Sequence, residues 1–120
     1  MANKILLAST LCSTICHLTA FLLSVQLPPT PYIIFIVMAL ITSIWNHSTT
    51  SELAKWSDRI TIGCGAVITY TIAPVNTIYF ILPIAVSSYG LAKKMNNCIP
   101  HIIAHISLTG INMYILMNGF

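Results

Sequence analysis

The chain has 120 residues, of which 57% are hydrophobic and only 6% are charged. Because soluble domains carry about 25% charged residues, this composition excludes an ordinary water-exposed surface and predicts a membrane protein. The apolar segments continue to residue 118, so a single signal peptide at the start of the chain does not account for them.

Five apolar segments follow one another along the chain, separated by the polar breaks QLPPTP, HSTTSELAKWSD, APVN and AKKMNNCIP. They lie at about residues 5–25, 31–47, 58–74, 77–92 and 99–118. A membrane-spanning helix needs about 20 residues, with a range of about 17–25, so the first and last segments fit easily and the fourth is the weakest. No alternation with a period of two persists over the length of a barrel strand. The sequence therefore predicts an all-α, polytopic transmembrane helical bundle of about five spans, with residues 1–120 as one domain.

The basic residues favour one orientation of this bundle. If all five segments span, all five basic residues lie on the same side of the membrane: Lys4, Lys55, Arg59, Lys93 and Lys94. The positive-inside rule then predicts a cytoplasmic N-terminus and places Phe120 outside. The net charge of +3 is thereby explained by topology. No basic run, RNA-binding aromatic motif or zinc-finger spacing indicates a nucleic-acid partner, and the sequence does not identify which membrane holds the protein.

Histidines supply the strongest functional signal, because ionisable groups inside spans are costly and indicate function by default. His101 and His105 form an H-x3-H motif in PHIIAHISL, which places both imidazoles on one face of a helix. His47 ends the second segment on the same side of the membrane, and Asp58 is expected to begin the third helix there. Three histidines and a water form a catalytic zinc arrangement. We therefore expect a Zn²⁺ site on His47, His101 and His105.

Two further residues are candidates for a catalytic role beside this site. Asp58 could hydrogen-bond the reacting water, act as a general base or orient a ligand. Ser43 lies one turn before His47 and is expected to face the same way. The alternatives are structural: Asp58 can serve as a helix N-cap, and Ser43 can bond back to its own helix or to a neighbour.

These motifs, in this order, resemble the CREST superfamily, which includes alkaline ceramidases, progestin and adipoQ receptors and haemolysin III-like proteins. The stretches SIWNHSTTSELAKWSDRITIGCGAVITYTIAP and HIIAHISLTGINMYIL are similar to its S-x3-H, Asp and H-x3-H helices, and they cover about 50 residues. The resemblance implies zinc on His47, His101 and His105, with Asp58 and Ser43 beside it, and hydrolysis of a lipid amide or ester, typically a ceramide. The family usually has seven spans. Removal of one helical hairpin before the last helix would leave that helix pointing the same way.

Other polar residues are interpreted structurally. Ser9, Ser13 and His17 form a stripe at intervals of four residues, and we expect it to serve helix packing or to line a cavity. Asn112 is expected to bond between helices, and Glu52 to lie in a solvated loop. Three remaining candidates are assigned no role in the site. Cys98 is not expected to be a ligand, and Trp45 and Trp56 are expected to lie at the membrane interface.

Three hypotheses remain open from the sequence. The first is a zinc-dependent intramembrane hydrolase with a membrane lipid as substrate. The second is a non-catalytic, metal-stabilised membrane protein that binds a lipid as a ligand, like a receptor. The third is a channel-like or membrane-organising protein without a metal. The Ser, Thr and Gly faces of the helices are compatible with packing between chains, so a homo-oligomer is also open.

Overall fold

A computed structural model describes residues 3–72 and 75–118, with the backbone alone for 75–82. Its five helices are α1 (Lys4–Leu23), α2 (Thr30–Ser48), α3 (Glu52–Ile72), α4 (Val75–Met95) and α5 (Cys98–Asn118). No strand is present in the described ranges. The predicted all-α helical bundle is therefore confirmed. The predicted break at 73–76 and the predicted location of Phe120 lie partly or wholly outside the described residues.

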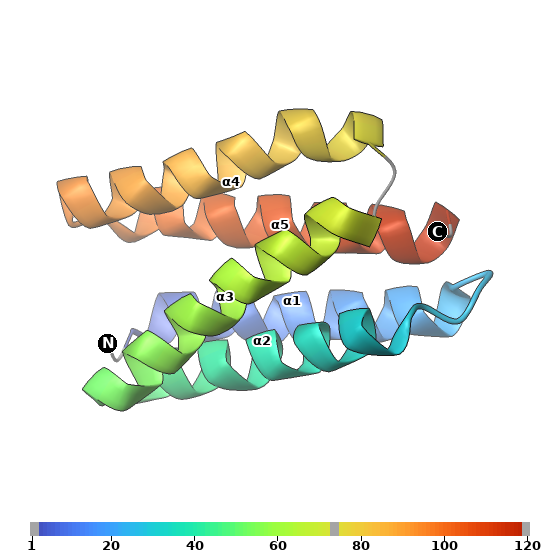
Figure 1. Cartoon of the computed structure of the whole chain (residues 1–120). Helices are drawn as coiled ribbons and strands as arrows, with labels where there is room; N and C mark the ends of the chain where they lie inside the picture. Colours follow the sequence, from blue (N-terminus) through green and yellow to red (C-terminus); the bar gives the residue numbers. More distant parts are fainter. Residues whose placement is uncertain (1–2, 73–74, 119–120) are drawn as a thin grey trace.

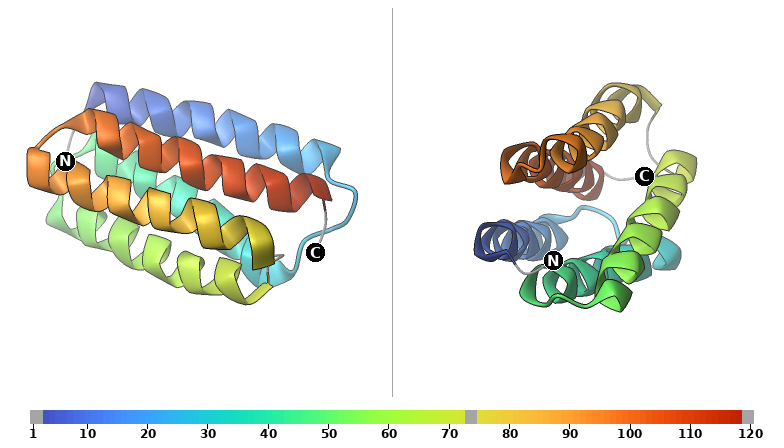
Figure 2. Two further views of the ribbon diagram at one scale, coloured as in Figure 1. Left: turned by 90° about the horizontal axis from the view of Figure 1, so that it is seen from above. Right: turned by 90° about the vertical axis from the view of Figure 1, so that its left-hand side faces the viewer.

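The helices lie along an arc rather than in chain order (Figure 1; Figure 2, right). α5 packs against α4 and α1, and α2 packs against α1 and α3, whereas α3 and α4 hardly touch. The last helix thus lies between the fourth and the first. A cluster of buried side chains joins α1, α2 and α5: Ala20, Tyr32, Ile36, Ile111, Ile115 and Leu116.

The outer surface of the bundle is apolar on every helix. One large side chain from each helix illustrates this, because each is more than half exposed: Ile15, Ile34, Val67, Val86 and Ile106. The buried positions, in contrast, include many polar residues, among them Thr10, His17, Asn46, Asp58 and Asn112. An apolar exterior around a partly polar interior fits a bilayer rather than water.

Three helices, α1, α2 and α5, are long and apolar enough to cross a membrane. α3 has 21 residues, but four of its first eight are charged: Glu52, Lys55, Asp58 and Arg59. The structure therefore supports a membrane protein by the length and composition of its helices. The count of five spans and the cytoplasmic N-terminus stay predictions.

The start of the third helix differs from the sequence prediction. We expected Asp58 to begin that helix and Glu52 to lie in a loop, but α3 begins at Glu52, which is in its first turn. The Ser51 hydroxyl accepts a hydrogen bond from the Ala54 N–H at 3.3 Å and so caps the helix. Asp58 is therefore not an N-cap. The hydrophilic sequence extends the helix beyond the apolar segment because capping and a first-turn carboxylate favour helix there.

The connection between α4 and α5 is also shorter than the predicted break at 92–100. Asn96 has a positive φ of 50°, and the Asn97 N–H donates to the Ala92 carbonyl at 3.2 Å. This 6→1 bond after a left-handed residue is the Schellman arrangement that ends helices. Asn97 then accepts from the Ile99 N–H at 3.0 Å and starts α5. Two residues, Asn96 and Asn97, thus connect α4 to α5.

One end of the bundle collects the basic residues. The starts of α1, α3 and α5 and the ends of α2 and α4 meet there, on the left in Figure 1. Lys4 begins α1, Lys55 and Arg59 lie in the first turns of α3, and Lys93 and Lys94 lie in the last turn of α4. We call this the basic end. His47, His101 and His105 belong to the helix ends that meet at it.

Candidate metal centre

His47 lies in the last turn of α2, with its ring enclosed by the bundle. The side chain is only 2% exposed. The Asn3 N–H donates to the His47 carbonyl at 2.9 Å, which ties the end of α2 to the start of α1. Within the described part of the chain, the two ring nitrogens of His47 are the only buried side-chain nitrogen or oxygen atoms that lack a hydrogen-bond partner. Such atoms call for an explanation, because leaving a buried polar group unpaired costs about 1–3 kcal/mol.

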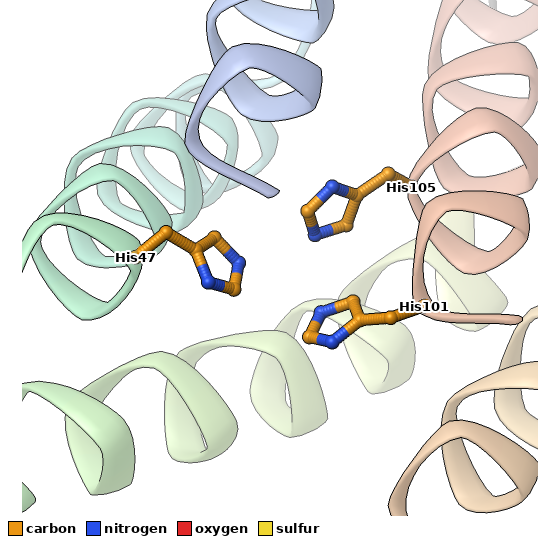
Figure 3. Close-up of side chains that lie close together, drawn as sticks. All are labelled: His47, His101 and His105. Carbon is orange, nitrogen blue, oxygen red and sulfur yellow. The ribbon is translucent and has the colours of Figure 1, made fainter. Parts of the chain in front are cut away.

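His101 and His105 come from the first two turns of α5 and face His47. Their spacing of four residues places both rings on one helix face, with centroids 4.7 Å apart. The His47 centroid lies 5.1 Å from that of His101 and 5.3 Å from that of His105. One ring nitrogen from each of the three lies within 4.8 Å of the others. Figure 3 shows the three rings pointing into one shared space. We call this group the histidine cluster.

The donor set of the histidine cluster fits a zinc ion. Neutral imidazole is a preferred zinc ligand, and catalytic sites use three protein ligands and keep one position open. Two nitrogens that are each about 2.1 Å from one ion lie at most about 4.2 Å apart. A spacing of up to 4.8 Å therefore requires small side-chain rotations to close around the ion. A bound metal would also give His47 the partner that its buried nitrogens lack.

Neighbouring side chains orient two of the three rings. The Ser9 hydroxyl lies 3.0 Å from Nδ1 of His105, within hydrogen-bond distance. With Nδ1 engaged there, Nε2 is the nitrogen left to bind a metal, as second-shell partners of metal-bound histidines commonly arrange. The Tyr89 ring packs edge-on against His101 with centroids 5.1 Å apart. The cluster is thus braced from α1 on one side and α4 on the other.

Asp58 is buried, and both of its oxygens bind donors from α2. Oδ1 accepts from Ser43 at 2.6 Å and from Thr42 at 3.4 Å, and Oδ2 accepts from Asn46 at 2.9 Å. Asp58 does not belong to the group of residues whose ligand atoms come together around the described site. The structure therefore brings Asp58 and Ser43 into contact with each other and joins α3 to α2 in the turn that precedes His47.

The polar stripe on α1 pairs with α5. Besides the contact between Ser9 and His105, the Ser13 and Thr109 hydroxyls lie 2.5 Å apart. Nε2 of His17 lies 3.1 Å from the amide nitrogen of Asn112, whose oxygen accepts from the Tyr32 hydroxyl at 2.7 Å. The predicted interhelical role of Asn112 is confirmed. His17 is buried in the same network and outside the histidine cluster, as the packing interpretation requires.

Two cavities adjoin the histidine cluster. The inner cavity, of about 80 Å³, reaches His105, Ser43 and His17 and is otherwise walled mainly by apolar side chains such as Leu40 and Ile62. The outer pocket, of about 500 Å³, reaches His47 and His101 at the basic end. Cys98 lines the outer pocket and is not among the clustered ligands. The cluster therefore faces a small, mainly apolar space on one side and a larger pocket with a more polar lining on the other.

Sequence reasoning missed three residues that contact the site or its supports: Ser9, Asn46 and Tyr89. Ser9 was assigned only to the stripe on α1, and Asn46 was assigned no site role. A local signal existed for Asn46, since Thr42, Ser43 and Asn46 share one helix face. Tyr89 had none, because α4 is brought to the cluster only by its packing on α5.

Comparisons with known proteins do not test the resemblance to the CREST superfamily, which depends only on the motifs in this sequence. No family model, curated protein or solved structure matches this chain.

Proposed function

We propose that the protein is a small zinc-dependent intramembrane hydrolase that acts on a lipid amide or ester near the cytoplasmic side. One observation carries the proposal: His47 is buried with both ring nitrogens unpartnered and faces His101 and His105. A structural histidine in such a position would normally hydrogen-bond to a neighbour. The resemblance of S-x3-H, Asp58 and H-x3-H to ceramidase-like sequences supports the same assignment.

The residues would divide the chemistry as follows. His47, His101 and His105 would hold zinc, which when bound polarises a carbonyl and lowers the pKa of water towards about 7. Ser43 lines the inner cavity together with His105, and its hydroxyl donates to Asp58. Ser43 would therefore position a water through its remaining lone pairs. Asp58 would act through Ser43 by accepting the hydrogen bond of its hydroxyl, which orients the Ser43 oxygen, and would hold the turn of α2 that carries His47.

The size of the inner cavity limits how a lipid could bind. Its volume of about 80 Å³ is well below the roughly 150 Å³ of an engineered cavity that binds benzene. A whole acyl chain does not fit in it. In this proposal the scissile group reaches the histidine cluster at the basic end, while the chains of the lipid stay in the bilayer beside the bundle.

Metal analysis of the detergent-purified protein tests the proposal directly. We expect about one zinc per chain, and loss of that zinc when His47→Ala is combined with His101→Ala. His17→Ala is the matched control, because His17 is the one histidine outside the cluster. A wild-type protein without stoichiometric zinc would defeat the proposal, as would zinc that survives the double substitution.

Turnover is then measured with short-chain ceramide and with a short-chain lipid ester. Cleavage of either one by the zinc-loaded protein, absent in the double histidine variant, supports hydrolysis. Asp58→Ala should reduce turnover, and Asp58→Asn distinguishes loss of the carboxylate from loss of packing, because an amide preserves the shape of the side chain. A failure of the zinc-loaded wild type to cleave any short-chain lipid amide or ester, with or without a phosphate in its headgroup, would contradict the hydrolase.

The second candidate is a metal-stabilised membrane protein that binds a lipid without cleaving it. It is favoured by the small inner cavity and by the engagement of both Asp58 oxygens with α2. This candidate predicts bound zinc together with no cleavage of either lipid probe, by the wild type or by Asp58→Ala. In either case the metal would join α2 to α5.

A further inference from the structure

The outer pocket at the basic end has the size and polarity of a ligand site. Its volume of about 500 Å³ falls within the range of about 300–1,000 Å³ that is usual for small-molecule sites. Helices α3 and α4 contribute its charged residues, and the histidine cluster lies at its inner side through His47 and His101. Neutral hydrogen-bonding groups, including Thr50, Ser51 and Asn96, line much of the rest.

The charge in this pocket is unbalanced. Three basic side chains line it, Lys55, Arg59 and Lys93, with Glu52 as the single acidic one. Glu52 is paired with Lys55 at 2.5 Å, and this hydrogen bond lowers the pKa of the Glu52 carboxyl. The chain has only two acidic residues. The other one, Asp58, binds donors from α2. Among the described residues, therefore, neither Arg59 nor Lys93 forms an ion pair with a carboxylate.

Arg59 is held in a defined position at the pocket wall. Its Nε donates to the Tyr89 hydroxyl at 3.2 Å, and its guanidinium carbon lies 5.2 Å from the centre of the Trp56 ring. The same Tyr89 ring packs on His101. One tyrosine thus contacts both the guanidinium and the histidine cluster, so an anion bound by Arg59 would lie close to the cluster.

The membrane orientation alone does not explain this grouping. All five basic residues lie at the basic end, but Lys4 and Lys94 do not line the outer pocket. A fixed guanidinium and an ammonium that line one pocket, whose single carboxylate is already paired with Lys55, are a favourable arrangement for a phosphate. Charge-assisted hydrogen bonds to phosphate are strong, and arginine presents several donors in a plane.

We propose that the outer pocket binds a phosphate group through Arg59 and Lys93, and that the lipid acted on at the histidine cluster carries this phosphate in its headgroup. The second half of this statement rests on the proposed function. The phosphate of a headgroup and a free phosphate share the chemistry that the pocket would recognise. They differ in whether apolar chains are attached, and the experiment separates them on that basis.

Calorimetric titration of the purified protein in an uncharged detergent tests the proposal. The probe is dihexanoyl phosphatidic acid, and dihexanoylglycerol is the matched lipid without phosphate. Arg59→Gln combined with Lys93→Gln should weaken binding of the phosphatidic acid about tenfold or more, because the lost hydrogen bonds join charged groups. The control is Lys4→Gln combined with Lys94→Gln, which removes the same charge from the same end and should change binding by about twofold or less.

Three outcomes would overturn the phosphate site: equal weakening in both double variants, no weakening in the pocket variant, or dihexanoylglycerol binding as tightly as phosphatidic acid. Inorganic phosphate forms the second arm. If it binds as tightly as the lipid with the same dependence on Arg59 and Lys93, the phosphate site stands and its assignment to a lipid headgroup falls. Melting temperatures of both double variants confirm that they fold.

The same samples keep this inference separate from the zinc proposal. Zinc content should be unchanged in the pocket variant, since neither Arg59 nor Lys93 belongs to the histidine cluster. Phosphate binding in a protein without zinc would overturn the hydrolase, and with it the lipid as substrate, but would leave the phosphate site standing. If the protein contains zinc and the pocket substitutions do not change its affinity for phosphatidic acid, the phosphate site alone is overturned.

Discussion

His47 carries an energetic penalty that only a partner can remove. Its ring is 2% exposed, so it loses hydration on folding, and neither nitrogen gains a hydrogen bond in return. His17 is equally enclosed but bonds to the Ser13 carbonyl and to Asn112. The two side chains are therefore chemically identical, but the cost of burying the ring is offset by hydrogen bonds at His17 and not at His47. In the absence of a metal, His47 weakens the fold and His17 supports it.

This contrast predicts opposite effects of replacing each histidine by leucine. In the presence of a chelator, His47→Leu should raise the free energy of unfolding by about 1–2 kcal/mol, because it removes an unpaired buried group. His17→Leu should lower it by about 1–3 kcal/mol, because Asn112 loses a partner. Thermal unfolding in detergent measures both. Added zinc should stabilise the wild type and leave His47→Leu unchanged; a loss of stability in His47→Leu under chelation would contradict the argument.

For single residues, the spacing along the sequence was enough to find the histidine cluster but not the side chains that contact it from α1 and α4. H-x3-H fixes two rings on one face whatever the helix packs against, and His47 follows from the end of its segment. Ser9 and Tyr89 contact the cluster from helices whose rotation is set only by packing. Because the inward face of a membrane helix also carries many apolar residues, hydrophobic periodicity alone does not indicate which side chains point inward.

Among the helices, the contact between α2 and α3 depends on the absence of one side chain. A Cβ at Gly65 would lie 1.5 Å from the Phe35 ring, whereas a Cβ at Gly63 would have nothing within 4 Å. Phe35 packs against the buried cluster of α1, α2 and α5. Gly65 thus lets α3 approach α2 closely, and this approach brings Asp58 to Ser43 and Asn46.

Gly65→Ala should therefore destabilise the protein by about 1–3 kcal/mol, the usual cost of overpacking. Gly63→Ala on the same helix is the control and should change stability by no more than about 0.5 kcal/mol. Equilibrium unfolding in mixed detergent micelles gives both values. Equal effects at the two glycines would show that the close approach of Phe35 does not matter. If α3 tilts away from α2, Gly65→Ala should also reduce zinc binding, because His47 lies one turn after Ser43.

The elements themselves were predictable to different degrees. The number of helices and the PPTP turn followed from composition, since proline and polar runs interrupt apolar segments. The predicted start of α3 was wrong by six residues, because the helix begins at Glu52 and not at Asp58. Charge suggested a loop there, but the Ser51 cap and the ion pair between Glu52 and Lys55 keep the segment helical. The hydropathy of the sequence indicates where the apolar, lipid-facing segment ends, and the helix can extend beyond that point.

For the molecule as a whole, the gathering of all basic residues at one end predicts a single orientation. With five spans, a fluorescent protein fused to the N-terminus should be cytoplasmic, and alkaline phosphatase fused after Phe120 should be active outside. Reporter activities in cells measure both ends. Two ends on the same side would mean an even number of spans, and would contradict the five-span prediction. Lys93→Gln with Lys94→Gln should weaken the preference by removing two of the five basic residues.

The position of α5 between α4 and α1 has a consequence for biosynthesis. Positions 47 and 101 are 54 residues apart, and a ribosome adds about 5–20 residues per second, so His47 is made about 3 to 11 seconds before His101. During that interval α3 and α4 are added to α1 and α2, while the helix that later lies beside α1 is still missing. The site is therefore the last part of the protein to assemble, and a chain that stalls before Cys98 contains His47 but neither of the other two histidines.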